Sequence, residues 1–156
     1  MSARCIIHMN KKEHNWNEVQ VGIIKSFISY LFNFALPDLK NDVTINLVTL
    51  AEEEVNGINK SLQTASVDTQ TRTCTIICKN RGMLDVLRSI AHECIHMAQR
   101  DRGDLKDDTV VSFYLPSENS AGYDLEYEAY GRSGIIVRNF RALLNKMFEK
   151  ENKEVV

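Results

Sequence analysis

The sequence lacks a marked excess of charge of either sign. Its 156 residues carry 19 Lys and Arg against 21 Asp and Glu, a formal net charge of −2 at pH 7. Nucleic-acid-binding proteins usually carry a basic surface, so this balance argues against nucleic acid as a partner. Apolar residues make up 44% of the chain and charged residues 26%, as in ordinary soluble proteins. With no internal repeat or low-complexity tract, we expect one folded domain over residues 1–156.

Long hydrophobic runs are also missing. A membrane-spanning helix needs about 20 mostly apolar residues. The most apolar segment, Val19–Leu36, is interrupted by five polar residues: Gln20, Lys25, Ser26, Ser29 and Asn33. The first 16 residues do not combine a basic stretch, an apolar run and a small-residue cleavage site, which a signal peptide requires. We therefore expect no membrane contact, no signal peptide and a cytoplasmic location.

The four cysteines form no metal-binding or redox pair. Cys5, Cys74, Cys78 and Cys94 match no CxxC spacing. Cys74 and Cys78 would lie on one face of a strand, where cysteine behaves as a small hydrophobic residue. We expect reduced thiols buried in the core, as is usual for a cytosolic protein.

The hydrophobic pattern predicts an α+β fold. Alternating β-branched and apolar residues indicate four strands, at Arg4–Met9, Asp42–Leu50, Ser61–Val67 and Arg72–Lys79. Helical spacing predicts a long helix that is capped by Asn15, with Glu18 completing a capping box, and ended by Pro37. Two further helices are predicted at Met83–Arg100 and Asp124–Lys150, with Gly103 as the stop of the first and a loop over residues 104–123 between them. We expect a small, mostly antiparallel sheet beside these three helices.

The clearest chemical motif is HExxH, formed by His92-Glu93-Cys94-Ile95-His96. In a helix, residues i and i+4 lie one turn apart on one face, so both imidazoles can point at one ion. Zinc suits two imidazoles and a carboxylate, with a further position left open for water. Glu93 would lie beside the metal as the general base. A chance HExxH in a chain of this composition has a probability of roughly one per cent or less.

The third metal ligand has to come from elsewhere in the chain. The remaining histidines, His8 and His14, are near the N-terminus, and the HExxHxxGxxH extension is absent. A downstream carboxylate is therefore expected. Glu126 and Glu128 are the candidates, and because they lie roughly 200° apart around a helix, both cannot face one ion. We favour Glu128, because the small Ala129 next to it would allow a close helix approach; Glu126 is the alternative.

Several other residues are candidates for supporting roles. Metal-bound histidines usually donate their second ring proton to an acceptor, and the nearby carboxylates are Asp101, Asp104, Asp107 and Asp108. Gln99 lies on the same helical side as His96, where it would either steady the site or contact substrate, or be an ordinary surface residue. Arg132 is four residues after Glu128 and could orient it. The phenols that could stabilise an oxyanion are Tyr114, Tyr123, Tyr127 and Tyr130.

The segments HECIHMAQRDRGDL and LEYEAYGR together resemble the small HExxH metallopeptidases of tailed-phage genomes. These are similar to minimal gluzincins and, more distantly, to SprT-like proteases. The matching residues are His92, Glu93, His96, Gln99, Gly103, Leu105, Glu126, Glu128, Ala129, Tyr130, Gly131 and Arg132. The family usually has Pro and Trp where this chain has Asp124 and Leu125. The resemblance covers about 50 residues, from near Leu84 to Arg132.

The resemblance implies a zincin-like hydrolase that cuts a peptide or protein substrate with Zn²⁺ as cofactor. It implies His92, His96 and Glu128 as metal ligands, and Glu93 and Tyr130 as catalytic residues. If the chain is phage-encoded, its location would be the host cytoplasm. The alternative from another functional class is an inactive, zinc-stabilised protein that binds a host or phage protein. A third possibility, a protease recruited to DNA, fits the near-neutral charge less well.

Overall fold

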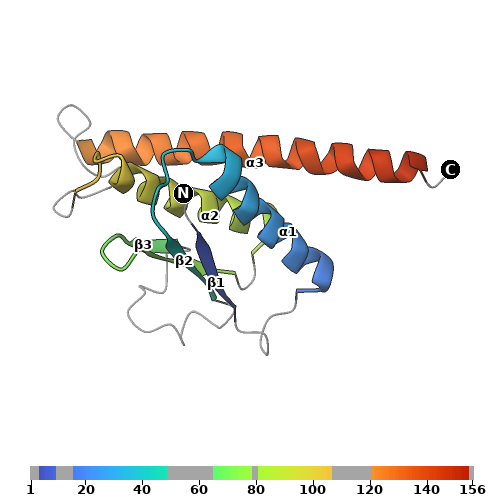
Figure 1. The fold of residues 1–156 in the computed structure, drawn as a ribbon, viewed down its shortest axis with the longest axis horizontal. Coiled ribbons are helices and arrows are strands. Elements are labelled where there is room, and N and C mark those ends of the chain that lie inside the picture. The colour runs from blue at the N-terminus through green and yellow to red at the C-terminus, as the bar shows by residue number, and fades with distance from the viewer. Residues whose placement is uncertain (1–3, 10–15, 49–64, 79–80, 107–120, 155–156) are drawn as a thin grey trace.

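The computed structural model describes residues 4–9, 16–48, 65–78, 81–106 and 121–154. This part of the chain has an α+β architecture, as expected: a four-stranded sheet with three helices on one of its faces (Figure 1). None of the helices in these ranges combines the length and the apolar character needed to cross a membrane.

The sheet is mixed. Its strands are β1 (Cys5–Met9), β2 (Val43–Val48), β3 (Ala65–Asp68) and β4 (Thr73–Ile77), in the order β1-β2-β4-β3. β2 pairs in parallel with both β1 and β4, and only β3 and β4 pair antiparallel. The expected mostly antiparallel sheet is therefore wrong. β1 and β2 are parallel because a helix connects them, and a helical crossover brings the chain back to start the second strand in the same direction as the first.

Helix α1 (Glu18–Tyr30) is this crossover. Its N-cap is Asn17, whose side chain accepts a hydrogen bond from the Gln20 amide at 2.9 Å, while the Gln20 side chain accepts one from the Asn17 amide. The capping box therefore begins two residues after the predicted Asn15. The helix continues into one π-helical turn, η1 (Leu31–Ala35), in which the Leu36 amide donates to the Leu31 carbonyl over 2.9 Å. Pro37 follows and prevents further extension.

Two helices bring the motif residues together. Helix α2 (Met83–Asp101) carries HExxH and lies on the sheet, in contact with β3 and β4. It ends at Asp101, and Gly103, two residues further on, has φ = 90°. A residue with a Cβ is strained in that region, so glycine is favoured there, and the predicted stop is confirmed. Helix α3 (Ala121–Glu154) begins three residues before the predicted start and lies along α2, with its C-terminal end extending past α1 (Figure 1).

One hydrophobic core joins the sheet and the helices. Phe27 of α1 and Phe140 of α3 pack edge to face, with ring centroids 5.0 Å apart. Cys74, Cys78 and Cys94 are buried in this core and Cys5 is partly buried, and all four thiols are free. These thiols have the state expected from the sequence.

The end of α2 is anchored to the sheet by a buried carboxylate. Asp101 accepts hydrogen bonds from the backbone amides of Lys40 and Asn41 and from the guanidinium of Arg72, at 2.8–3.2 Å. Arg72 adopts φ = 56°, an uncommon value for a non-glycine residue, in the turn between β3 and β4. This anchor fixes the position of α2, and with it the histidines, relative to the strands.

Candidate metal centre

The two histidines of the motif point to a common position. His92 and His96 are one turn apart on α2, and their Nε2 atoms are 3.2 Å apart. Their rings meet edge to face with centroids separated by 4.8 Å. His96 is buried and His92 partly buried. The helix therefore brings both Nε2 atoms together, as the i, i+4 spacing predicts.

Glu126 of α3 completes a group of three possible ligands. Its Oε1 lies 2.6 Å from Nε2 of His92 and 3.4 Å from Nε2 of His96. In a tetrahedral zinc site with bonds near 2.0–2.1 Å, neighbouring ligand atoms are about 3.3 Å apart. Two of the three separations are close to that value. The third is shorter, and it would reach that value if the side chains separated by less than 1 Å.

The donor set fits a cation on a second ground. Oε1 of Glu126 is enclosed by the protein, yet no group in the described part of the chain makes a well-aligned hydrogen bond to it. A buried carboxylate oxygen without a partner is costly, so such groups generally pair with a charge or a metal. A metal ion bound by the two Nε2 atoms would satisfy this oxygen.

The pKa values follow from burial and from these contacts. Burial would raise the pKa of Glu126, but the adjacent His92 and His96 hold it at about 2. Burial would likewise lower the pKa of His96, but its contacts with Glu126 and Gln99 outweigh burial and raise it. Glu126 is therefore ionised over the physiological range and suited to act as an anionic ligand.

Glu93 is buried beside the histidines. Burial raises its pKa, against the opposing effect of His96 and His92. A carboxylate with a raised pKa is a better proton acceptor than an exposed one. Its neighbour Cys94 is fully buried and points into the core, as expected.

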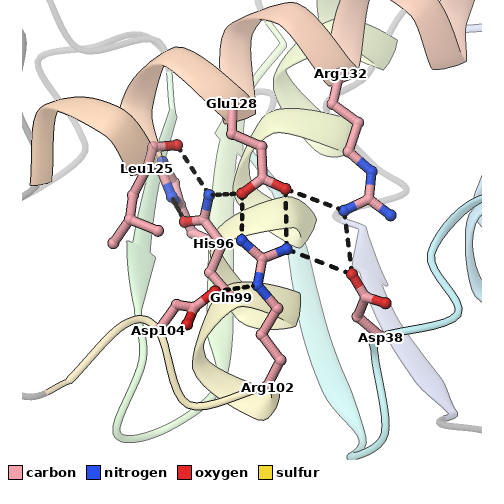
Figure 2. Close-up of polar contacts among 8 residues, drawn as sticks. All are labelled: Asp38, His96, Gln99, Arg102, Asp104, Leu125, Glu128 and Arg132. Carbon is pink, nitrogen blue, oxygen red and sulfur yellow. Dashed lines mark hydrogen bonds and ion pairs between the residues drawn. The ribbon is translucent and has the colours of Figure 1, made fainter. Parts of the chain in front are cut away.

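Glu128 does not lie where the sequence analysis placed it. Its carboxylate is paired with Arg102, the C-cap residue of α2, and with Arg132 of α3, and it accepts a hydrogen bond from the amide nitrogen of Gln99 (Figure 2). Hydrogen bonds from Arg102 are the main cause that lowers its pKa to about 2. The structure therefore corrects the expected arrangement, because Glu126 and not Glu128 faces the histidines. The predicted pairing of Arg132 with Glu128 is confirmed, at 3.3 Å.

The other sequence candidates are distributed around this group. Tyr130 packs its ring against the imidazole of His92, with centroids 4.4 Å apart, while more than half of its side chain is exposed. Asp101 binds Arg72 and Asp104 binds Arg102, so neither of these predicted carboxylates is the partner of His96. That partner is Gln99, whose Oε1 is 2.8 Å from Nδ1 of His96. Asp107, Asp108 and Tyr114 lie outside the described residues.

Two residues of the ion-pair cluster were not anticipated from the sequence. Arg102 bridges Glu128, Asp104 and Asp38, and Asp38 also contacts Arg132 (Figure 2). One signal for Arg102 was available, because it follows Gln99 by three residues and so continues the helical side that faces α3. Asp38 lies in the connection between η1 and β2, and the sequence offers no signal for its role.

Comparisons with known proteins add no identity to this geometry. No family model matches the chain, and neither the curated proteins nor the solved structures include a significant match.

Proposed function

We propose that the chain is a zinc-dependent peptidase with a zincin-like fold, similar to the small HExxH enzymes of phages. The observation that carries the proposal is the convergence of three ligand atoms. These are Nε2 of His92, Nε2 of His96 and the otherwise unpartnered Oε1 of Glu126. Two imidazoles and one carboxylate are a donor set of catalytic zinc sites. When bound, zinc would polarise the scissile carbonyl and lower the pKa of a water molecule.

Glu93 is the residue we assign to proton transfer. It is adjacent to His92 in the chain, and its raised pKa suits a group that must both take up and release a proton. In the proposed reaction its carboxylate accepts the proton of the attacking water. It then passes that proton to the leaving amine as the peptide bond breaks.

Two further features fit a peptide substrate. Tyr130 stands against His92 at the exposed side of the site, and its phenol could donate a hydrogen bond to the developing oxyanion. Among the strands in the described ranges, β3 lies at an edge of the sheet, where it pairs with β4, and α2 contacts it. An extended peptide can add to such an edge through backbone hydrogen bonds. We therefore propose β3 as the strand that aligns the substrate.

The test uses the purified protein with and without zinc, and an unfolded protein such as reduced casein as substrate. We expect cleavage that requires zinc and is lost in Glu93→Gln, while zinc binding, measured by competition with a chromogenic chelator, is retained. Glu149→Gln, an exposed change on the same helix as Glu126, is the matched control and should cleave normally.

Two other results would lead to different conclusions. Equal behaviour of the wild type and Glu93→Gln in every peptidase assay, with zinc bound in both, would reject the enzyme. It would instead favour the inactive, zinc-stabilised interaction protein. Failure of the wild type to bind zinc would reject both functions.

A further inference from the structure

The amide of Gln99 has only one chemically acceptable orientation. Gln99 is fully buried, and its Nε2 lies 2.8 Å from the carbonyl oxygen of Leu125 and 2.9 Å from Oε1 of Glu128 (Figure 2). A backbone carbonyl and a carboxylate that is ionised at neutral pH only accept hydrogen bonds. If the amide were flipped, its oxygen would face these two acceptors and no donor. The nitrogen must therefore point to Leu125 and Glu128.

This orientation determines where the proton of His96 resides. The remaining atom of the amide, Oε1 of Gln99, lies 2.8 Å from Nδ1 of His96. Because that oxygen can only accept, Nδ1 must carry the hydrogen. In a neutral ring the other nitrogen, Nε2, then has a free lone pair. Nε2 is the atom that lies 3.2 Å from His92 Nε2 and 3.4 Å from Glu126 Oε1.

We propose that Gln99 is a positioning residue that holds His96 in the Nδ1–H tautomer, so that Nε2 is preset to bind the metal. This inference rests on the proposed zinc site. Without an acceptor at Nδ1, a neutral imidazole distributes its proton over both nitrogens, and binding through Nε2 must first displace it. The loss of such an outer partner typically costs 10–100-fold in metal affinity.

The side-chain amide of Gln99 is itself held in place by Glu128 and the ion pairs of that carboxylate. Arg102 binds Glu128, and Glu128 accepts the hydrogen bond of Gln99. Arg132 approaches the same carboxylate from α3 and also contacts Asp38. A continuous series of contacts therefore joins Arg102, at the exposed end of α2, to the buried ring of His96.

The first test is a measurement on the metal-free wild type. Two-dimensional ¹⁵N–¹H spectra of the imidazole rings, recorded at a pH above the raised pKa of His96, distinguish the two neutral tautomers. We expect His96 to show the protonated-nitrogen shift at Nδ1. An Nε2–H tautomer, or an equal mixture, would overturn the proposal without any variant being needed.

The second test compares two substitutions of Gln99. Gln99→Met keeps the length of the side chain but removes the acceptor, so we expect the tautomer preference to disappear and zinc affinity to fall about 10–100-fold. Gln99→Glu keeps an acceptor at Nδ1 but loses the donor to Leu125 and Glu128. We expect it to retain the Nδ1–H tautomer and most of the zinc affinity.

A merely structural role would give a different pattern. Gln99→Glu disturbs the contact with α3 at least as much as Gln99→Met does, so a structural role would weaken zinc binding equally in both. That result would refute the proposal. Should Gln99→Glu fail to fold beside Glu128, the double variant Gln99→Glu/Glu128→Gln supplies a donor opposite the new carboxylate. If the wild type shows the Nδ1–H tautomer but binds no zinc, the proposed zinc site is rejected, whereas the role of Gln99 in setting the tautomer stands.

Discussion

Glu126 and Glu128 can be assigned separate roles by measuring stability with and without zinc. At a free zinc concentration one hundred times Kd, binding to the folded state alone adds about 2.7 kcal/mol to the free energy of unfolding. For a chain of this length, 1 kcal/mol corresponds to about 2–4 °C in Tm. We therefore expect zinc to raise the Tm of the wild type by about 5–10 °C.

Glu126→Gln should remove most of this zinc-dependent rise, because it replaces one of three ligands with a neutral amide. Its metal-free stability should also fall, because the adjacent His92 and His96 hold the pKa of Glu126 at about 2 and this favourable contact is lost in the variant. The loss of the zinc-dependent rise is therefore the result that identifies Glu126 as a ligand.

Glu128→Gln should lower the metal-free stability but keep the zinc-dependent rise. The pKa of Glu128 falls from 4.5 to about 2 through its contacts with Arg102 and Gln99. Converted in full, that displacement is worth about 3 kcal/mol. Because the carboxylate remains 29% exposed, solvent screening reduces our expectation to about 1–2 kcal/mol. The metal-free Tm should therefore fall by about 2–8 °C while the zinc-dependent rise persists.

Differential scanning fluorimetry of the three proteins, with and without zinc, provides the measurement. Glu149→Gln on the exposed face of α3 is the control for loss of one negative charge. If Glu128→Gln abolished the zinc response and Glu126→Gln kept it, the assignment of Glu126 would be refuted. No zinc response in the wild type would refute the metal site itself.

Three further predictions concern the structure around the site. The folded-state pKa of Glu128 is depressed, so the stabilisation from its ionised form is present above pH 4.5 and is lost as the pH falls toward about 2. The difference in unfolding free energy between the wild type and Glu128→Gln, measured by urea titration, should therefore shrink over that range. A difference that stays constant would contradict this prediction. Asp101→Ala removes the ion pair with Arg72, which keeps its hydrogen bonds to the carbonyls of Asn41 and Asp42, and should cost about 1.5–3 kcal/mol by urea unfolding. A loss near zero would show that the anchor is dispensable. Gly103→Ala forces a Cβ into φ = 90° and should destabilise by about 1–2 kcal/mol. Gly131→Ala, at an open helical position, should stabilise by about 0.5–1 kcal/mol, and equal effects at the two glycines would disprove the conformational argument.

The elements of the fold were readable from the sequence because each has its own hydrophobic period. Helix α2 was predicted from Met83 to Arg100 and ends one residue later. Strand direction was not readable in the same way, because alternation of side chains is the same in parallel and antiparallel pairs. The connection through α1 did contain the needed signal, since a strand, a helix and a strand in succession usually form a parallel unit. The cap was misplaced because Asn15 and Asn17 are each followed three residues later by a suitable side chain.

The site was predicted as far as local spacing determines it. His92 and His96 meet because both lie on one helix, and no tertiary information is needed for that. The choice between Glu126 and Glu128 depends on the rotation of α3 about its axis, which is set by residues far away in the sequence. Arg102 lies 26 residues before Glu128, and Asp38 still further away. Sequence spacing on α3 alone cannot show which of its two acids meets a guanidinium and which meets two imidazoles.

Glu126 and Glu128 therefore contribute to the proposed site in different ways: Glu126 faces the histidines, and Glu128 helps to position α3. Opposite sides of α3 carry Glu126 and Glu128, so whatever fixes one carboxylate also fixes the other. The ion pairs of Glu128 with Arg102 and Arg132 act together with the apolar packing of α3 in the core to place Glu126 against His92 and His96. The same carboxylate of Glu128 holds Gln99, so the rotation of α3 and the tautomer of His96 depend on one cluster of charges.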